Sequence, residues 1–365
     1  EIKRVINIPV VSGGLVSDPT IAERLLEEEA LDMVWVDRQL IADPDWPNKV
    51  RTGRLEDIRP CCACNDGCIG RVFINKPVWC TVNPMTGFEY RWANEEALPK
   101  PAKSKRVLIV GAGPGGLEAA RICAIRGHQV LIVENAEQIG GTVNIASIPS
   151  FKKRWRKLIE WYGTQLTKLR VEIQLNTKAT VRLIEKEAPD VIVLATGSEP
   201  VIPDIPGIEK AAVGDDVLLG KKNVGQNVVI IGGGLEGLDI ALYLAKQGKK
   251  VTIAEALPRV GVDLEITTQM SFSRKPGGLI DKYEIAIMTE SPVIEVKDNG
   301  VEVVDKLGCR KLIDGDTIIC AAGRKSVLNS ELMEDIEQVY VIGDARAPRK
   351  ITDAIHEGFT AALDI

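Results

Sequence analysis

The sequence predicts an α/β protein built from doubly wound, mostly parallel sheets, and two observations carry this prediction. First, a strand, a glycine-rich loop, a helix and a second strand follow one another over 106–133, and the same succession returns over 228–254. Second, short apolar strands alternate with helical stretches through most of the remaining chain, which is typical of parallel sheets. A repeated unit of this kind is the building block of the Rossmann-like fold.

The composition is that of an ordinary soluble protein with two or three domains. Of the 365 residues, 45% are hydrophobic and 27% are charged, as in most globular chains. The formal net charge of −5 gives no electrostatic reason to expect binding to nucleic acid or to an anionic membrane. No apolar run is long enough to span a bilayer, and no signal peptide is visible. We therefore expect a cytoplasmic protein.

The first 57 residues alternate strands and helices. Strands are expected at 8–12 and 33–36, and Asp-Pro at 18–19 fits the start of the helix between them. These are two successive βα units, too few to close a barrel or a sheet alone. Gly14 and Arg38 each follow a strand and are candidate cofactor ligands, because barrel phosphate sites use such loops. The alternative for Arg38 is a surface side chain beside a turn.

Five of the eight cysteines crowd into residues 61–80. Such crowding indicates metal binding in a reducing compartment rather than disulfides. Four of them, at spacings of two, three and eleven intervening residues, can hold an iron–sulfur cluster: Cys61, Cys64, Cys68 and Cys80. Zinc is the alternative, although zinc sites usually show two CxxC pairs or a nearby histidine, and neither is present. Cys62 adjoins the first of the four and is expected to be a spectator.

Two glycine loops fit G-x-G-x-x-G, and each joins an apolar strand to a helix. Their glycines are Gly111, Gly113 and Gly116 in the first loop, and Gly232, Gly234 and Gly237 in the second. An acid, Glu134 or Glu255, follows each third glycine by eighteen residues. Glycines let backbone amides approach a pyrophosphate, and the acid can bind a ribose diol. Each loop is a candidate dinucleotide site, with a tight turn that binds no ligand as the alternative.

The rest of the chain supplies connecting and closing elements. Residues 93–105 have the composition of a linker, and 191–194 form a third strand of the first sheet. The segment after the second loop is rich in strands, with a turn at 298–300. The chain closes with a strand over 339–342, then Gly343 and Asp344, and a helix from about residue 351.

At these motifs the chain resembles the 2,4-dienoyl-CoA reductase, 2-enoate reductase and trimethylamine dehydrogenase family of iron–sulfur flavoproteins. The resemblance spans essentially the whole sequence. Cys61, Cys64-Asn65, Cys68 and Cys80 to Pro84 are similar to the family's [4Fe–4S] segment. Its FAD site is matched by Gly111 to Gly116, Glu134, Gly140-Gly141 and Gly343-Asp344, and its closing helix by 353–358. Residues 8–47 resemble the last two units of its N-terminal FMN barrel.

The resemblance implies four parts. Residues 1–57 would be the end of an FMN-type (β/α)8 barrel, and 58–98 the cluster segment with a linker. Residues 99–220 and 310–365 would form an FAD-binding domain, into which an NAD(H)-binding domain of 221–309 is inserted. Only 60 residues precede the cysteines, whereas such a barrel needs roughly 200–250. We expect a partner chain or a missing N-terminal segment to complete it, FMN to bind only in that completed barrel, and the protein to be oligomeric.

The family's activity would then be electron transfer from NADH through FAD and the cluster to FMN, with reduction of an activated C=C bond in a small-molecule enoate or enoyl thioester. Three alternatives stay open. One is an amine dehydrogenase of the trimethylamine type, against which the intact second loop with Glu255 argues. Another is a diaphorase subunit that serves a separate catalytic chain. The last is a nucleotide-binding regulatory module without redox chemistry, which the cysteines disfavour.

Overall fold

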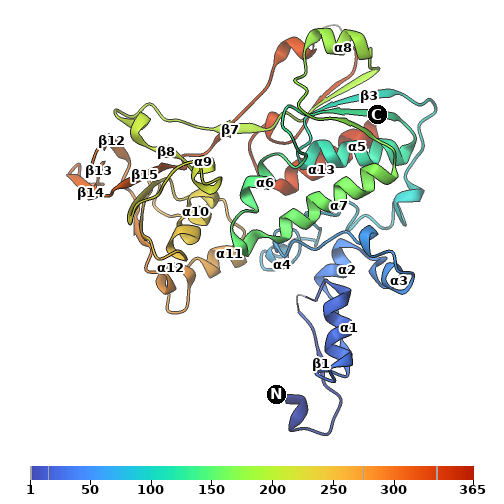
Figure 1. Cartoon of the computed structure of the whole chain (residues 1–365), viewed down its shortest axis with the longest axis horizontal. Coiled ribbons are helices and arrows are strands. Elements are labelled where there is room, and N and C mark those ends of the chain that lie inside the picture. The colour runs from blue at the N-terminus through green and yellow to red at the C-terminus, as the bar shows by residue number, and fades with distance from the viewer. Residues whose placement is uncertain (1, 15, 274, 334–335) are drawn as a thin grey trace. The chain divides into compact units, whose positions relative to one another are not determined.

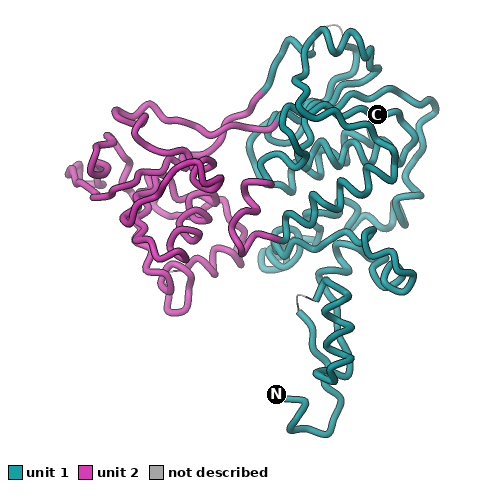
Figure 2. Tube along the Cα trace, viewed as in Figure 1, with its two compact units in different colours: residues 1–143, 154–196, 328–365 teal, residues 144–153, 197–327 magenta. Residues whose placement is uncertain are grey.

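The computed structural model describes residues 2–14, 16–273, 275–333 and 336–365, and the chain divides into two compact units. Unit 1 comprises 1–143, 154–196 and 328–365, and unit 2 comprises 144–153 and 197–327 (Figure 2). The cysteine segment and the first glycine loop both belong to unit 1, whereas the second glycine loop belongs to unit 2.

Unit 1 is built on a five-stranded parallel sheet with the order β17-β6-β3-β4-β5. Its strands are β3 (Arg106–Val110), β4 (Gln129–Val133), β5 (Glu172–Gln174), β6 (Val191–Leu194) and β17 (Val339–Val341). Of the strands in this sheet, β3 (labelled in Figure 1) comes first along the chain. It lies between β4 and β6, so the strand order reverses beside it. Doubly wound sheets bind their ligands at the carboxyl edge of such a reversal.

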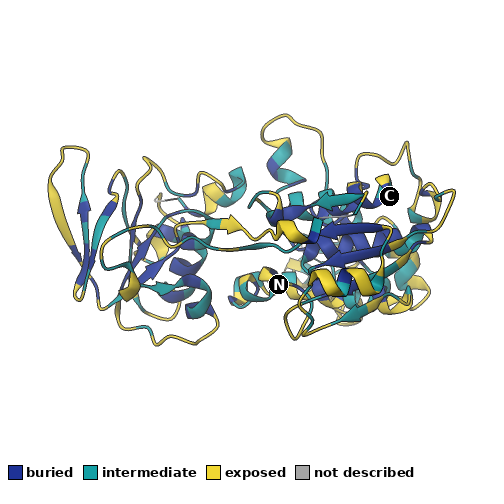
Figure 3. Cartoon of the chain, turned by 90° about the horizontal axis from the view of Figure 1, so that it is seen from above, coloured by how far each residue is buried: buried dark blue, intermediate teal, exposed yellow. Residues whose placement is uncertain are grey.

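Helices cover both faces of this sheet, which explains why its strands are runs of Val, Ile and Leu. They are α5 (Pro114–Arg126), α6 (Thr142–Ala146, shared with unit 2), α7 (Arg154–Lys168), α8 (Val181–Glu187) and α13 (Ile351–Asp364). On one face Leu117 of α5, Leu158 of α7 and Ile355 of α13 are fully buried in one core. On the other face Ile184 of α8 packs against the sheet. Figure 3 shows buried strands at the centre of this sheet, whereas β5 and β17 at its edges are only partly buried.

Unit 2 holds a second five-stranded parallel sheet, with the order β11-β10-β9-β15-β8. Its strands are β8 (Ala212–Val213), β9 (Asn227–Ile231), β10 (Lys250–Ala254), β11 (Ala286–Met288) and β15 (Thr317–Cys320). An antiparallel sheet of β12 (Val293–Lys297), β13 (Gly300–Val304) and β14 (Arg310–Asp314) and the pair β7 (Ser198–Pro200) and β16 (Arg324–Ser326) accompany it. The helices are α9 (Gly214–Leu218), α10 (Leu235–Ala245), α11 (Ile266–Ser271) and α12 (Leu279–Lys282). The strand order again reverses beside the strand that precedes the glycine loop.

The limits of unit 2 differ from the domain predicted over 221–309. Strand β15 was expected to lie in the FAD-binding part but pairs with β9, and β8 in turn pairs with β15. Strands β7 and β16 pair with each other and also fall in unit 2. The prediction missed these strands because their partners lie about 90 or more residues away, and such pairing leaves no local pattern in the sequence.

The βα units predicted over 1–57 form, but their strands are shorter than expected. Only β1 (Val11–Ser12) and β2 (Met33–Val34) pair, in parallel, and α1 (Pro19–Glu27) connects them. Within the described residues this sheet has two strands, so few hydrogen bonds between strands are available to lengthen them. The apolar side chains of Val11 and Met33 are exposed, whereas strands of a complete parallel sheet are covered on both faces.

The segment that leads to the cysteines is helical. It contains α2 (Arg38–Ala42), α3 (Trp46–Arg51) and, among the cysteines, α4 (Ile69–Val72). Arg38 was predicted to lie at the end of a strand. Instead it begins α2, because the Asp37 carboxylate accepts the Arg38 N–H and caps that helix. In the part of the chain that the structure describes, no helix has the length and apolar character that a membrane crossing requires.

Candidate cofactor sites

The first glycine loop follows β3 and opens α5 at the switch point of the unit 1 sheet. A side chain at Gly111, whose φ is +105°, would collide with the Ala195 carbonyl, and one at Gly116 would collide with the Gly111 carbonyl. Gly113 is different, because nothing lies within 4 Å of the place where its Cβ would be. Two glycines therefore allow the tight turn, and the third leaves an open approach to the N-terminus of α5.

Three further predicted residues gather at this loop. The Glu134 carboxylate, at the end of β4, accepts hydrogen bonds from Ala112 N (2.7 Å) and Ala136 N (2.8 Å). The Gly140 N–H donates to the Ala112 carbonyl at 2.8 Å, and a Cβ on Gly141 would lie 3.2 Å from Gly113 Cα. The structure thus brings Glu134 and Gly140-Gly141 to the same loop, as a dinucleotide site requires.

Helix α13 brings Gly343 and Asp344 to the same edge of the sheet. Gly358 of α13 lies so close to the Gly115 carbonyl that a Cβ would collide with it, and Gly343 packs against Ala354 of the same helix. The Gly343 N–H donates to Glu357 at 2.8 Å. Asp344 Oδ1 accepts from Arg349 N at 3.1 Å. The residues predicted for the FAD site therefore converge from β3, β4 and β17.

The second glycine loop repeats this geometry in unit 2. Gly232 and Gly237 make the same close approaches, to Ala321 and to the Gly232 carbonyl. The Glu255 carboxylate, at the end of β10, accepts from Gly233 N and Leu257 N, both at 2.6 Å. The repeat in the sequence is thus a repeat in structure, and each acid is held beside its loop by two backbone amides.

One feature of the second loop has no counterpart in the first and was missed from the sequence. Both carboxylate oxygens of Asp263 accept from Leu235 N, at 3.1 and 2.9 Å. A Cβ on Gly234 would lie 3.3 Å from this carboxylate. The N-terminus of α10, where a pyrophosphate is expected, therefore already carries an anion of the chain itself.

A partly buried acid also lies in the second loop. Glu236 is 3.7 Å from Arg324, which also pairs with Asp215. Burial raises the pKa of the Glu236 carboxyl to about 7, and Asp215 adds to this effect, although Arg324 opposes it. The charge beside this loop therefore changes close to neutral pH.

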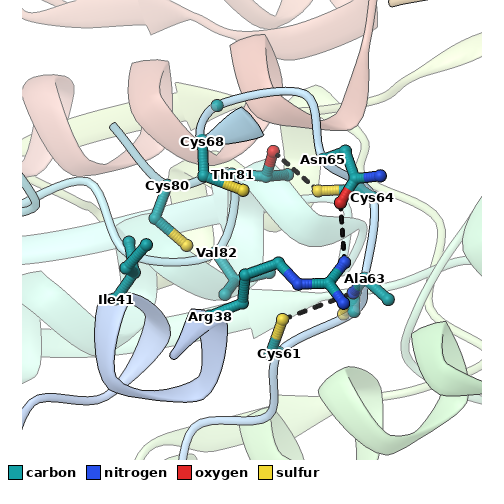
Figure 4. Close-up of a pocket in the computed structure, with 12 residues that line it drawn as sticks. Arg38, Ile41, Cys61, Ala63, Cys64, Asn65, Cys68, Cys80, Thr81 and Val82 are labelled. Carbon is teal, nitrogen blue, oxygen red and sulfur yellow. Dashed lines mark hydrogen bonds between the residues drawn. The ribbon is translucent and has the colours of Figure 1, made fainter. Parts of the chain in front are cut away.

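The cysteines line one cavity of unit 1 (Figure 4). Its walls include all four predicted ligands, Cys61, Cys64, Cys68 and Cys80, together with the predicted spectator Cys62 and with Arg38. Burial raises the pKa of each of the four thiols, to about 12 for Cys80. Binding of a metal centre must therefore displace protons here, as is general for thiolate ligands.

The cavity fits an anionic group that is larger than one ion. Within the described residues, no three Cys, His, Asp or Glu side chains converge closely enough to surround a single metal ion. Zinc needs four donors about one point, whereas in a [4Fe–4S] cluster each thiolate binds its own iron. Arg38 Nε is buried without a hydrogen-bond partner and lines the same cavity. A cluster held by four thiolates is an anion and suits that guanidinium.

Arg38, predicted as a phosphate ligand, lies beside the cysteines. Its guanidinium points among them, and Nη1 donates to Asn65 Oδ1 at 2.7 Å (Figure 4). Gly14, the other predicted phosphate ligand, follows β1 with φ +109° and has nothing within 4 Å of its Cβ position.

Polar side chains outside the predicted site residues tie this cavity to α13. His356 Nε2 lies 2.8 Å from the Cys80 carbonyl. The Cys64 thiol donates to Thr81 Oγ1 at 3.2 Å, and Thr81 Oγ1 lies 2.8 Å from Thr352 Oγ1. A threonine directly after a cysteine ligand was the only local signal, and its partner on α13 is 271 residues away.

Comparison with known proteins identifies the family of the chain. The family model for pyridine nucleotide-disulphide oxidoreductases matches residues 105–358, which contain both glycine loops. The chain is 40% identical to NADH oxidase of Thermoanaerobacter brockii, over 100% of this chain and 56% of the relative. It is 36% identical to cinnamate reductase of Clostridium sporogenes, over 100% of this chain and 54% of the relative.

A solved structure of 2-naphthoyl-CoA reductase in complex with 2-naphthoyl-CoA has a TM-score of 0.91 and 38% identity to this chain, over 100% of this chain and 55% of that one. The chain thus spans about half the length of the relatives it matches. The resemblance to reductases of the 2-enoate type is confirmed, as is the Rossmann-type α/β fold. The chain belongs to the pyridine nucleotide-disulphide oxidoreductase family.

Proposed function

We propose that this chain is the electron-input part of an iron–sulfur flavoprotein oxidoreductase. Electrons would pass from NADH through FAD and a [4Fe–4S] cluster to FMN and on to an activated C=C bond. One observation carries the proposal: the cavity of four cysteines and the first glycine loop lie in one compact unit, and α13 contacts both. It meets the cysteines through His356 and Cys80, and the loop through Gly358 and Gly115.

Each part of the proposed path has its own residues. The first loop with Glu134 would hold the FAD pyrophosphate and adenosine ribose, and Asp344 would lie near the ribityl–phosphate stretch. The second loop with Glu255 would hold NADH, and the thiolates of Cys61, Cys64, Cys68 and Cys80 would hold the cluster. When bound, these groups supply hydride acceptance and one-electron transfer, while the chain supplies binding and orientation.

The substrate class and the remaining cofactor belong to the completed protein. Relatives named for cinnamate and for 2-naphthoyl-CoA support an unsaturated or aromatic acid or its thioester. Residues 1–57 would be the last two βα units of the FMN barrel, with their exposed Val11 and Met33 covered by a partner chain or by a further segment. FMN is proposed only for that completed barrel, and Gly14 is its proposed ligand in this chain.

The cluster is tested by assays of iron and acid-labile sulfide. Serine at any of the four proposed ligands should remove most of both, because each thiolate binds a separate iron. Cys62→Ser is the matched control, since it changes a neighbouring cysteine that lines the same cavity, and it should retain the cluster. Near-normal iron in all four ligand variants would refute the assignment.

The FAD site has an equally direct test. Gly113→Val should abolish FAD binding but not folding, because φ at Gly113 is −74° and nothing lies within 4 Å of its Cβ position. Flavin released by denaturation is identified and counted, and circular dichroism checks the fold. A folded Gly113→Val protein with full FAD occupancy would show that this loop does not bind the pyrophosphate.

A diaphorase subunit that serves another chain is the second candidate, favoured by the match of residues 105–358, which contain both glycine loops, to pyridine nucleotide-disulphide oxidoreductases. Both candidates predict use of NADH over NADPH, because Glu255 would accept from the ribose hydroxyls and repel a 2′-phosphate. An amine dehydrogenase does not need that preference. Comparing kcat/KM for the two nucleotides with a dye acceptor separates these classes. Equal use of NADPH would count against both candidates, and Glu255→Gln should narrow the preference.

A further inference from the structure

The hydroxyls of Thr81 and Thr352 form a buried relay that begins at one of the four cysteine sulfurs. Only 1% of Thr81 and 5% of Thr352 is exposed. Thr81 Oγ1 lies 3.2 Å from Cys64 Sγ and 2.8 Å from Thr352 Oγ1. Thr352 Oγ1 also lies 2.8 Å from Asp66 Oδ2. The relay therefore joins the cysteine segment to the first turn of α13.

The direction of this relay depends on the state of Cys64. As a thiol, Cys64 donates to Thr81, so Thr81 can donate to Thr352, and Thr352 to the Asp66 carboxylate. A thiolate bound to iron has no proton to donate. The Thr81 hydroxyl must then turn and donate to the sulfur, and the Thr352 hydroxyl can turn from the Asp66 carboxylate to donate to the oxygen of Thr81.

We infer that Thr81 and Thr352 are positioning residues that set the reduction potential of the cluster through the Cys64 sulfur. This inference rests on the proposed [4Fe–4S] site. Hydrogen bonds to ligand sulfurs are among the factors that determine cluster potentials, because a donor stabilises the more negative, reduced state. Adjacent hydroxyl donors polarise one another, so Thr352 strengthens the bond that Thr81 makes.

Cys64 has a backbone donor, as Cys61 does, and a side-chain partner in addition. Cys61 Sγ accepts from Ala63 N–H at 3.4 Å (Figure 4) and Cys64 Sγ from Asp66 N–H, and a backbone donor stays whatever side chain is present. The bond between Cys64 and the Thr81 hydroxyl can be removed by substitution. The relay also places the potential of the cluster under the influence of α13, the helix that packs against the first glycine loop.

The test is a redox titration of the purified, cluster-loaded protein, followed by electron paramagnetic resonance of the reduced cluster. Thr81→Val removes the donor with little change in volume and should shift the midpoint potential to a more negative value. Thr81→Ser keeps the hydroxyl and should restore the wild-type potential. Thr352→Val should give a smaller shift of the same sign. Thr86→Val is the matched control, because it removes a buried hydroxyl that bonds to the Ile41 carbonyl instead of a sulfur.

A second readout does not depend on the potential. Resonance Raman bands of the Fe–S(Cys) stretch should move between H2O and D2O in the wild-type protein, and this shift should shrink in Thr81→Val. An unchanged potential in a fully loaded Thr81→Val protein would overturn the inference. If Thr81→Val fails to hold the cluster, an unchanged potential in Thr352→Val overturns it instead. Absence of iron and sulfide from the wild-type protein would refute the proposed function, whereas loaded variants with unaltered potentials refute only the relay.

Discussion

At the scale of single residues, the two glycine loops differ in what lies at the helix N-terminus. Gly113 leaves the first approach open, whereas the Asp263 carboxylate bonds to Leu235 N in the second. Anions are stabilised at a helix N-terminus, so Asp263 stabilises the empty loop and competes with a pyrophosphate. Binding at the second loop is then an exchange of one anion for another.

Asp263→Asn should tighten NADH binding, because the substitution removes the competing charge. A charge at this position is worth about 1 kcal/mol, or roughly fivefold in Kd. Isothermal titration with NADH measures the change, and Asp298→Asn, at an exposed carboxylate of the same unit, should leave Kd unaltered. Weaker binding in Asp263→Asn would mean that Asp263 aids the nucleotide.

Glu236 predicts a pH dependence of stability. Its pKa is raised from 4.5 to about 7, so between these values the folded chain holds a proton that the unfolded chain has released. The free energy of unfolding therefore falls as the pH rises through this window, by on the order of 2 kcal/mol. Urea unfolding at pH 5 and pH 8 should show a smaller difference for Glu236→Gln than for wild type. Glu209→Gln, at an exposed position, should match wild type.

At the scale of elements, an ion network joins the cysteine segment to α5. The Glu95 carboxylate bonds to Arg59, two residues before Cys61, and to Arg121 of α5 at 2.7 Å. Arg121 is almost fully buried and also pairs with Glu118. Burial alone would raise the pKa of Glu95, but the two arginines outweigh it and lower the pKa to about 2.

Glu95→Gln should destabilise unit 1 by roughly 3 kcal/mol, because it removes the carboxylate that pairs with buried Arg59 and one of the two that pair with buried Arg121. The pH dependence of stability follows from the lowered pKa of Glu95. Its contribution to the free energy of unfolding is complete above pH 4.5 and is lost as the pH falls towards 2. Chemical denaturation at neutral pH measures the loss. The neighbouring, exposed Glu96→Gln provides the control, and an equal effect of both would contradict the network.

The sequence predicts an element well when neighbouring residues determine it, and poorly when residues far along the chain do. The glycine loops, the acids after β4 and β10, and the Asp18 cap of α1 were predicted because each depends on a few adjacent residues. The placement of β15 in unit 2 was not, since its partner β9 is distant in the chain. Arg38 was predicted at the end of a strand, but the short β2 ends at Val34 and Asp37 then starts a helix. Asp263 and Thr352 act on residues far along the chain, so no nearby motif marked them.

At the scale of the whole molecule, the two nucleotide folds are complete in the described chain, whereas residues 1–57 are not a closed barrel. Each fold has five strands in a switch-point order. The parallel pair β1 and β2 instead exposes Val11, Met33 and Trp35. Uncovered strands of this kind are prone to pair or aggregate.

The 365-residue chain alone should therefore oxidise NADH with a dye acceptor, bind little or no FMN and fail to reduce an enoate or enoyl thioester. It should also aggregate or bind its completing partner through residues 1–57. Flavin analysis, steady-state assays and light scattering test these outcomes together. A monodisperse protein loaded with FMN that reduces a C=C bond unaided would overturn the interpretation of residues 1–57.

The contacts between the cysteine segment and α13 have a consequence for biosynthesis. The cysteines leave the ribosome well before α13, because Thr352 and His356, which bond to Thr81 and to the Cys80 carbonyl, are made more than 270 residues later. The contacts that hold the lining of the cavity against α13 therefore form only after both glycine loops have been translated. Iron and sulfide delivery should accordingly follow translation, and nascent chains arrested before α13 should leave their cysteines open to alkylation.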